Sequence, residues 1–460
     1  MLAVALPWVE ERRTIPVPCT PSDPEHYVIS SSHIAIIGSG YVGLTTGVCL
    51  SSLGHEVTCV DTDAATIDML RRGHTALAEP GLDALLRDGL DAHTLDFDTT
   101  ADAAVSTSDN VFLCLPTPSG PDGAADLTAI KQTIATIRDL LRPSAVLIVK
   151  STVPVGTTAA IRAWLCRPDV DIVSNPEFLR EGHAIYDFLH PARILIGADD
   201  PAAAKKVTAL YDPVRTEVII TSAATAELAK YAANSFLATK LSYVNTVAEM
   251  CEKLGADITD LIRVLGTDPR IGAEFLRPGP GWGGPCLPKD TRALLQQARH
   301  AGVDFPILAA AIASNTHHHD WVIDSLNREL AGRIAGTRIG VLGLTFKAGT
   351  NDLRDSPAIH IARALADRGA VILTHDPTVF HDIAGIATTT DPYGVAEGAN
   401  ELLILTDWPE YRSLDWRRLA QSMNGDLVLD ARSTLVPEQL NAAGLRCISI
   451  GRARPEQKFR

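Results

Sequence analysis

The sequence predicts an α/β protein in which two doubly wound domains are joined by a long central helix and a helical middle domain. Three observations lead to this fold class. A strand, a glycine turn, a helix and a second strand follow one another from about residue 33, and a similar succession returns from about residue 337. Between them, more than 40 residues from about residue 222 contain no proline. Alternating strands and helices are typical of parallel sheets, so both outer domains are expected to be Rossmann-like.

The length of 460 residues is enough for about three domains. Residues near the beginning are rich in Pro, Ser and Thr and show no period, which favours a loosely ordered extension. We therefore expect four segments: an extension at 1–32, a first Rossmann-like domain at 33–221, a central helical domain at 222–334 and a second Rossmann-like domain at 335–460.

Composition and charge exclude several classes of protein. Hydrophobic residues make up 46% of the chain and charged residues 21%, as in folded proteins of ordinary composition. With 41 Lys and Arg against 55 Asp and Glu, the net charge of −14 would repel a phosphate backbone, so we expect no nucleic-acid partner. No apolar run approaches the ~20 residues of a membrane span, and MLAVALPWVEERR has no basic leader. We expect a cytoplasmic protein without a membrane partner.

Eight cysteines are present and none forms a CxxC pair, so no metal site is expected. Contexts such as VTCVD and VFLCLP indicate thiols buried in strands. We expect seven cysteines to be packing residues: Cys19, Cys49, Cys59, Cys114, Cys166, Cys251 and Cys447. The eighth, Cys286, stands in the Gly- and Pro-rich stretch GPGWGGPCLPKD, where it is either an ordinary loop cysteine or a thiol presented to a ligand.

The first glycine turn predicts dinucleotide binding. In HIAIIGSGYVGLTTGVCLSSLGHEVTCVDTD, Gly38, Gly40 and Gly43 fit the pattern G-x-G-x-x-G between a strand and a helix. The first glycine makes the tight turn, and the second admits a pyrophosphate to the N-terminus of the helix. Asp61 ends the second strand, where a carboxylate accepts hydrogen bonds from a ribose diol and repels the extra phosphate of NADP. NAD is therefore the expected cofactor.

Three later strands also end in polar residues. Thr117, Thr152 and Glu177 follow the runs NVFLCLP, AVLIVK and DIVSNP, at the ends that face the ligand crevice of a parallel sheet. Each of them alone is equally consistent with a residue that caps a turn or a helix. Together they favour a ligand-binding or catalytic site at these strand ends.

The proline-free stretch from Ala223 to Gly266 is predicted to be strongly helical, with a long helix from about Ala223 to Leu254 that connects the outer domains and offers a dimer surface. Lys230 and Asn234 are four residues apart and so lie on one face of it, although exposed polar residues would be unremarkable at these positions. The apolar faces of the helix are covered either by a second copy of the chain or by the flanking domains.

The second glycine unit, TRIGVLGLTFKAGTNDLRDSPAIHIARALADRGAVILTHDP, repeats the first layout and ends in Asp376, but it departs from the full dinucleotide pattern. The loop with Cys286 lies between the two units in the sequence. A cleft between two such domains is a preferred ligand site, which favours a presented thiol.

Six motifs, taken in order, resemble one known family. GSGYVG, KSTVPVGT, NPEFLREG, AKYAANSFLATKLSYVN, DPRIGAEFLRPGPGWGGPCLPKD and GLTFKAGTNDLRDSPA are similar to the UDP-glucose/GDP-mannose dehydrogenase family over roughly residues 32–450. The resemblance implies a two-step oxidation of the C6 alcohol of a nucleotide sugar to a carboxylate, with two NAD per sugar. An aldehyde has no good hydride to give until a nucleophile adds to its carbonyl, and this requirement explains a thiol in the site.

The resemblance also assigns roles to residues. Cys286 matches the nucleophile that forms a thiohemiacetal and then a thioester, and Lys230, Asn234 and Asp290 match the groups around C6. Lys230 would stabilise the oxyanion, and Asp290 would order a water or accept its proton. Glu177, with Thr152 nearby, would be the general base in thioester hydrolysis.

Binding positions follow from the same motifs. The positions that match cofactor contacts are Gly38, Gly40, Tyr41, Val42, Gly43, Asp61, Thr117, Thr152, Glu181 and Arg354. The positions that match the nucleotide-sugar site are Glu177, Phe178, Leu179, Lys230, Asn234, Arg270, Phe275, Leu276, Gly279, Gly281, Lys347 and Arg432. Of these, Arg270 resembles an arginine that reaches into the site of a partner subunit, so at least a homodimer is expected.

The motifs depart from the family at two places and leave the sugar open. Pro285 and Leu287 flank the cysteine where many relatives carry Ser and an aromatic residue. The loop with Lys289 is similar to the branch that converts UDP-glucose to UDP-glucuronate. The alternatives are the same chemistry on a UDP-N-acetylhexosamine or GDP-mannose, and a non-catalytic sensor of nucleotide sugars.

Lys289 would lower the pKa of the Cys286 thiol and Asp290 would raise it, so the sequence leaves the net direction of the pKa shift open.

Overall fold

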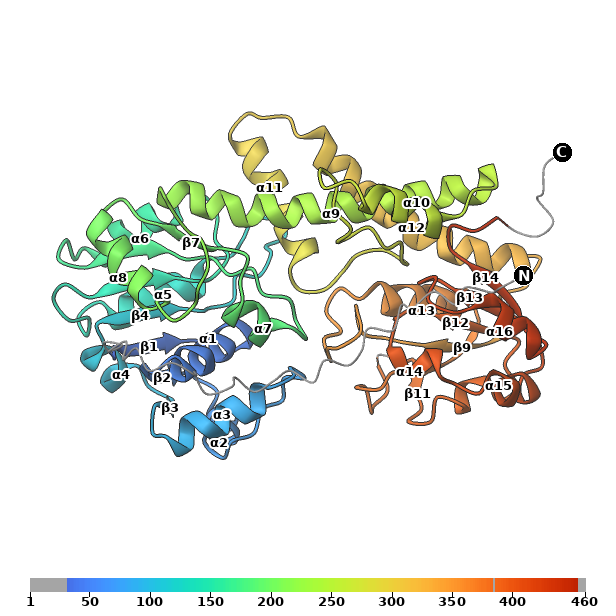
Figure 1. Ribbon diagram of the computed structural model, residues 1–460, viewed down its shortest axis with the longest axis horizontal. Helices are drawn as coiled ribbons and strands as arrows, with labels where there is room; N and C mark the ends of the chain where they lie inside the picture. The colour runs from blue at the N-terminus through green and yellow to red at the C-terminus, as the bar shows by residue number, and fades with distance from the viewer. Residues whose placement is uncertain (1–30, 384, 454–460) are drawn as a thin grey trace.

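The fold class that the sequence predicts is confirmed. The computed structural model describes residues 31–383 and 385–453, so Cys19 and nearly all of the predicted extension at 1–32 lie outside the described residues. Two twisted sheets stand at opposite ends of the molecule, and α9 (Ala223–Leu254) runs between them (Figure 1). A helical layer around α9 therefore joins two α/β units.

The first sheet has the strand order β3-β2-β1-β4-β5-β6-β7-β8, and its pairs are parallel except β6 with β7. The order reverses between β1 and β4, and ligands bind outside the carboxyl ends of strands at such a switch point. The strands are β1 (His33–Ile37), β2 (Glu56–Val60), β3 (Leu95–Asp98), β4 (Asn110–Leu113), β5 (Val146–Val149), β6 (Asp171–Ser174), β7 (Ile194–Gly197) and β8 (Val218–Thr221).

Helices cover both faces of this sheet. Alternation along β1 sends Ile34 and Ile36 into one core, and Ala35 and Ile37 into the other. One face packs against α1 (Tyr41–Ser52), α2 (Ala64–Arg71), α3 (Leu82–Asp91), α7 (Ala184–Leu189) and α8 (Pro201–Ala209). The other packs against α4 (Asp102–Thr107), α5 (Thr128–Ile137) and α6 (Thr157–Leu165). Both faces are apolar because the sheet is buried between helices.

The long helix is shorter than the proline-free stretch. Ser222 caps its beginning by accepting a hydrogen bond from the backbone of Thr225, and the helix ends at Leu254 because Gly255 adopts a φ of 78°. A separate helix, α10 (Ile258–Gly266), starts after Asp257. The long helix predicted from about Ala223 to Leu254 is therefore confirmed. Two further helices pack on α9, namely α11 (Leu287–His300) and α12 (Pro306–Glu329).

The second sheet is parallel throughout and has the order β11-β10-β9-β12-β13-β14, which repeats the order of the first six strands of the other sheet. Its strands are β9 (Arg338–Leu342), β10 (Val371–His375), β11 (Ala387–Thr388), β12 (Glu401–Ile404), β13 (Leu427–Asp430) and β14 (Arg446–Ser449). They pack against α13 (Pro357–Asp367), η1 (Gly394–Ala396), α14 (Pro409–Arg412), α15 (Trp416–Ser422) and α16 (Pro437–Ala442). The predicted boundaries at 221 and 334 stay a proposal, which the ends of β8 and α12 support.

The prediction for the cysteines was partly wrong. Cys49, Cys59, Cys114 and Cys251 are buried and Cys447 is half-buried, but Cys166 is exposed. Cys166 lies just beyond the end of α6 with a φ of 52°, so it ends a helix at the surface instead of filling a core. In the same part of the chain, residues 31–383 and 385–453, no helix has the length and apolar character that a bilayer crossing requires.

Candidate active site

The first glycine turn has the geometry of a dinucleotide site. Gly38 adopts a φ of 99° and donates to the carbonyl of Val60, and a Cβ on Gly38 would lie 2.6 Å from the carbonyl oxygen of Cys114. A Cβ on Gly43 would lie 1.8 Å from the carbonyl oxygen of Gly38, whereas one on Gly40 would meet no atom within 4 Å. The turn is therefore closed on the protein side and open at Gly40, where a pyrophosphate would approach.

Asp61 is available to a ligand, in contrast to its counterpart in the second unit. Its carboxylate accepts from the backbone N–H of Ser39 at 2.8 Å, and the residue is half-buried at the end of β2. Asp376 is buried and accepts hydrogen bonds from Leu344, Thr345 and Trp408. Asp61 is thus open to a ribose whereas Asp376 is not, and the residues present in the first unit fit NAD.

The polar residues at the strand ends lie beside this turn. Thr117, after β4, is buried and donates its hydroxyl to the backbone oxygen of Thr152 at 2.8 Å. Tyr41 and Val42 open α1, and Val42 packs against the core of the first sheet. The ends of β1, β4 and β5 therefore converge at the switch point, as the sequence predicts.

A buried ion pair and a buried hydrogen bond join the predicted catalytic residues. Lys230 Nζ lies 2.9 Å from Glu177 Oε1, and both side chains are more than 90% buried. Asn234 donates its amide to Asp290 Oδ2 at 2.6 Å. The alternative of exposed polar residues at 230 and 234 is thereby excluded. Two polar contacts, one turn of α9 apart, face the loop with Cys286.

Both members of the ion pair are charged. Burial acts to raise the pKa of Glu177, but the charge of Lys230 and a hydrogen bond from the backbone of Leu179 hold that pKa below its ordinary value. Burial acts to lower the pKa of Lys230, and Glu177, Cys286 and Asp290 hold it above its ordinary value. Glu177 is thus ionised and able to accept a proton.

Cys286 precedes the first turn of α11 and is exposed to solvent. Protein nevertheless surrounds the thiol on most sides, and this burial raises its pKa to about 12, with Lys230 as the main opposing charge. Lys289 acts less because its ammonium bonds to Asp290 Oδ1 at 2.6 Å. Burial therefore sets the balance that the sequence left open, and the strongest opposing charge is Lys230, which lies on α9 and not beside the cysteine in the chain.

The predicted sugar-binding loop reaches the second sheet. Phe275 adopts a φ of 60° and Leu276 is buried. Gly279 lies against the guanidinium of Arg432, since a Cβ on it would be 2.9 Å from Arg432 Nη1. Arg432 is anchored by the carbonyl oxygens of Leu405 and Phe346. The loop thus extends from the catalytic residues to the carboxyl ends of β12 and β13.

Sequence reasoning missed two buried asparagines that hold this loop. Asn245 of α9 accepts from the backbone N–H of Gly279 at 2.9 Å, and Asn315 of α12 accepts from Trp282 N–H at 2.7 Å and donates to its carbonyl at 2.9 Å. The available signal was an asparagine on the apolar face of a helix. Such a side chain must find partners, and here an irregular loop supplies them.

Comparison with known proteins gives the family. Residues 32–215 match the NAD binding domain of the UDP-glucose/GDP-mannose dehydrogenase family, residues 224–317 its central domain and residues 340–437 its UDP binding domain. A UDP-glucose 6-dehydrogenase of Rhizobium meliloti is 41% identical over 433 residues, which cover 91% of this chain and 99% of that protein. The chain belongs to the UDP-glucose/GDP-mannose dehydrogenase family. NAD is accordingly its cofactor.

Further proteins are similar to this chain over most of its length. A UDP-glucose 6-dehydrogenase of Pseudomonas aeruginosa is 37% identical over 92% of this chain and 98% of that protein. The solved UDP-glucose dehydrogenase of the archaeon Pyrobaculum islandicum is 32% identical, with a TM-score of 0.86 over 95% of this chain and 100% of that one. The solved UDP-D-ManNAc dehydrogenase of Pyrococcus horikoshii is 28% identical, with a TM-score of 0.82 over 91% and 99% of the two chains.

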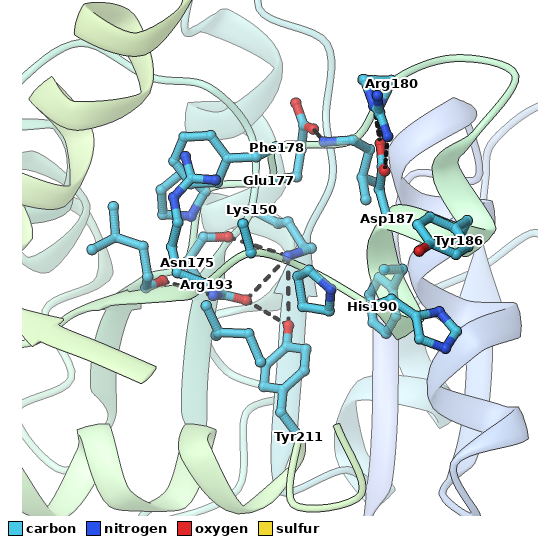
Figure 2. A pocket seen from close by; sticks show the side chains of 17 residues that line it. Lys150, Asn175, Glu177, Phe178, Arg180, Tyr186, Asp187, His190, Arg193 and Tyr211 are labelled. Carbon is cyan, nitrogen blue, oxygen red and sulfur yellow. Dashed lines mark hydrogen bonds and ion pairs between the residues drawn. The ribbon is translucent and has the colours of Figure 1, made fainter. Parts of the chain in front are cut away.

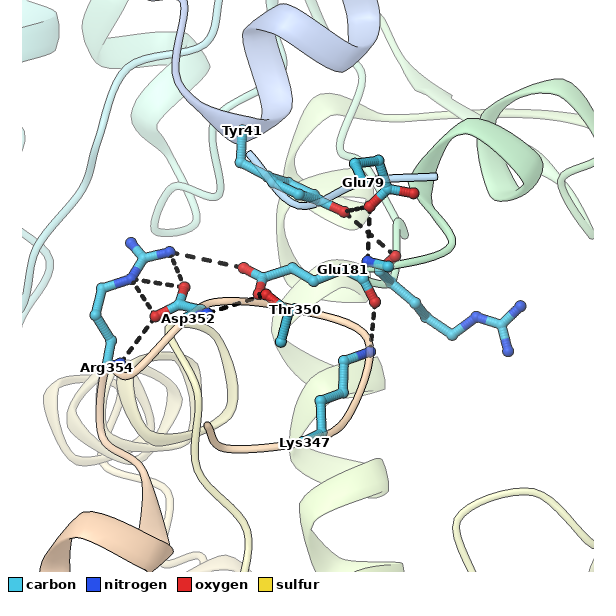
Figure 3. Close-up of polar contacts among 9 residues, drawn as sticks. Tyr41, Glu79, Glu181, Lys347, Thr350, Asp352 and Arg354 are labelled. Carbon is cyan, nitrogen blue, oxygen red and sulfur yellow. Dashed lines mark hydrogen bonds and ion pairs between the residues drawn. The ribbon is translucent and has the colours of Figure 1, made fainter. Parts of the chain in front are cut away.

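Residues predicted to contact the cofactor also join the two α/β units (Figure 3). Glu181 accepts from the hydroxyl of Thr350 at 3.1 Å and pairs with Arg354 at 3.6 Å, and its backbone oxygen accepts from Lys347. Tyr41 donates to Glu79 beside them. The predicted sugar contact Lys347 therefore bonds to the first unit in this structure. Burial, and then the charge of Asp352, raise the pKa of Glu181 to about 7.

Arg270 lies apart from the other predicted residues. Its side chain is 87% exposed, and the guanidinium pairs with Asp268 two residues before it. Phe178 and Leu179 lie with the catalytic cluster, where the Phe178 ring is within 5.3 Å of Lys230 Nζ and 3.7 Å of the Arg193 guanidinium carbon. The side chain of Arg270 thus faces solvent and Asp268, and the cluster around Lys230 forms without it.

The glycine turn generates a paired prediction. Gly43→Ala should lower the free energy of unfolding by about 2 to 4 kcal/mol, because its Cβ would overlap the backbone of Gly38. Gly40→Ala should leave the unfolding temperature unchanged and weaken NAD binding, since its Cβ points into open space. Thermal unfolding and calorimetric titration with NAD measure the two effects. Unchanged NAD affinity in Gly40→Ala would contradict the placement of the pyrophosphate.

The raised pKa of Glu181 generates a pH prediction. Because the folded-state pKa of about 7 exceeds the ordinary 4.5, the stability associated with protonated Glu181 is full below pH 4.5 and is lost as the pH rises through 7. Glu181→Gln should remove this loss, so the variant should gain stability relative to the wild type from pH 4.5 to 7. Urea unfolding at several pH values measures it. The exposed Glu397→Gln serves as the control, and an equal change there would refute the assignment.

Proposed function

We propose that this chain is a UDP-glucose 6-dehydrogenase, which oxidises the C6 alcohol of UDP-glucose to the carboxylate of UDP-glucuronate with two NAD. The observation that carries this proposal is the convergence of the Lys230–Glu177 ion pair and the Asn234–Asp290 hydrogen bond on Cys286. It is supported by family relatives of that name that align over more than 90% of the chain.

Cys286 links the two oxidations in this proposal. NAD supplies the hydride acceptor for both of them. After the first oxidation, the sulfur of Cys286 adds to the C6 aldehyde, a C–S bond forms, and the carbonyl oxygen takes up the thiol proton to give a thiohemiacetal. Loss of the C6 hydride and the hydroxyl proton leaves a thioester. Water then cleaves the C–S bond, which releases the carboxylate and returns the thiol.

The neighbouring residues serve each step. Lys230 would stabilise the C6 oxygen as it becomes negative. Asn234 and Asp290 would orient that oxygen or the attacking water. Glu177 is ionised and takes the proton of that water. Thr152, whose carbonyl accepts a hydrogen bond from Thr117, would lie between the bound cofactor and Glu177 and would assist the hydrolysis step. The loop from Phe275 to Gly281, with Arg432, holds the nucleotide.

The test of this function is a substrate panel. The wild type should form two NADH per UDP-glucose and little from UDP-N-acetylglucosamine or GDP-mannose. Cys286→Ser should lower net acid formation by at least about 10³-fold while NAD binding persists, because an alkoxide leaves an acyl group less readily than a thiolate does. Absorbance of NADH and mass spectrometry of the variant measure both. Normal turnover of Cys286→Ser would refute the covalent route, and activity confined to another sugar would refute the substrate.

We also propose that the active species is at least a homodimer formed through α9. Phe236, Tyr243 and Met250 are each more than half exposed, and they follow one another at seven-residue spacing, so they form one apolar stripe along the helix. The exposed Arg270 would then reach the sugar site of the partner. The free buried thiols of Cys49, Cys59 and Cys114 fit the cytoplasmic location that we include in this proposal.

Subunit complementation tests the shared site. Arg270→Ala and Cys286→Ala chains should each be inactive, and mixing them should restore up to about a quarter of the activity, since hybrid dimers contain one intact site. Light scattering should find no active monomer. An active monomer, or no recovery after verified subunit exchange, would argue against a site that two chains share.

A further inference from the structure

A pocket of about 300 Å³ lies beside the loop that carries Glu177 (Figure 2). It is lined by residues 175–180, by α7 and by residues 190–195, and Glu177 and Lys150 both contribute to its wall. Lys150 directly follows β5 and is 4% exposed. Neither the resemblance nor the proposed reaction gives this buried lysine a role.

The hydrogen-bond partners of Lys150 are neutral. Its ammonium donates to the side-chain oxygen of Asn175 at 3.1 Å and, with longer contacts, to the backbone oxygen of Asn175 and the hydroxyl of Tyr211 (Figure 2). Tyr211 in turn donates to the same Asn175 oxygen at 2.6 Å. A buried ammonium without a contacting carboxylate is costly, and an apolar side chain of equal size would avoid that cost.

This cluster fixes the strand end from which Glu177 departs. β5 and β6 pair through Val149 and Ser174, so Lys150 and Asn175 are neighbours at the next position. The Asn175 amide also donates to the carbonyl of Leu195 on β7, at the place where β6 and β7 share a single residue pair. The side chains therefore replace the sheet bonds that this junction lacks. Glu177 follows only two residues later.

Glu177 feels the positive charges of Lys230 and Lys150. In the proposed reaction, on which this inference rests, Lys230 also serves the oxygen that becomes negative at C6. Lys150 is then the second positive charge near Glu177, and it continues to stabilise the ionised carboxylate while Lys230 interacts with the C6 oxygen. The groups that face Lys150 from surrounding elements are Cys49, Cys114, Asn175, Glu177, Phe188, Tyr211 and Lys230.

We propose that Lys150 is a positioning residue for the catalytic base: it fixes the loop that presents Glu177 and supplies a positive charge that favours the ionised form of that carboxylate. Burial lowers the pKa of Lys150 to about 8, while the charge of Glu177 acts to raise it. The lysine is therefore protonated in neutral solution, where Glu177 must be ionised to act. Loss of the charge raises the pKa of Glu177 and leaves the carboxylate protonated at a higher pH.

The test compares two neutral variants with one that keeps the charge. Lys150→Met and Lys150→Gln should move the acid limb of the kcat profile up by about one pH unit or more, with NAD affinity unchanged. Tyr211→Phe removes a partner of the cluster and keeps the ammonium, so its acid limb should stay in place. Infrared difference spectra, in which Glu177→Gln identifies the band of the Glu177 carboxyl, should show the same shift without turnover.

Each alternative outcome is decisive. An equal loss of activity at all pH values in the three variants, with the Glu177 band unmoved, would show that Lys150 only supports the fold. Failure of both neutral variants to fold, judged by circular dichroism, would also overturn the proposal, because a positioning role predicts a folded and impaired enzyme. If the wild type never forms NADH from UDP-glucose, the proposed function is refuted. The infrared measurement would still decide the role of Lys150, because it does not require turnover.

Discussion

The buried ion pair between Lys230 and Glu177 is the interaction on which the candidate site depends. Two charges that are more than 90% buried stabilise one another only if their geometry is held closely, and removing either would leave the other buried without its counter-ion. The pair joins α9 to the loop after β6, so it ties the helical layer to the first sheet. It also keeps a carboxylate ionised beside a thiol and a positive charge beside the reacting oxygen.

The rigidity of α9 turns one helix face into a row of functional contacts. Glu227, one turn before Lys230, accepts hydrogen bonds from the backbone N–H groups of Gly156 and Thr158 and so caps α6. Asn234, one turn after Lys230, reaches Asp290. Asn245, farther along, holds the loop at Gly279. A single helix therefore sets the spacing from the cofactor side of the site to the loop that reaches the second sheet.

Loops of the two α/β units meet at polar contacts that are ionisable and partly exposed. Glu181 of the first unit bonds to Thr350 and Arg354 of the second, while Arg432 lies against the loop at Gly279. Such contacts are weaker than apolar packing and respond to pH and to charged ligands. The catalytic cluster, in contrast, rests on buried bonds within the first sheet, α9 and α11. Chemistry and domain contact are thus carried by different kinds of interaction.

The sequence by itself determined the two α/β units, the glycine turn with Asp61 and the motif residues of the site, because periodicity and turn chemistry are local. It did not determine that Asn245 and Asn315 hold the loop at Gly279 and Trp282. Nor did it determine that Asp376 accepts hydrogen bonds from Leu344, Thr345 and Trp408. It also left open that burial governs the pKa of the Cys286 thiol and that Lys230, more than Lys289, opposes it. Those outcomes depend on which distant side chains burial brings into contact, and only the tertiary structure decides that.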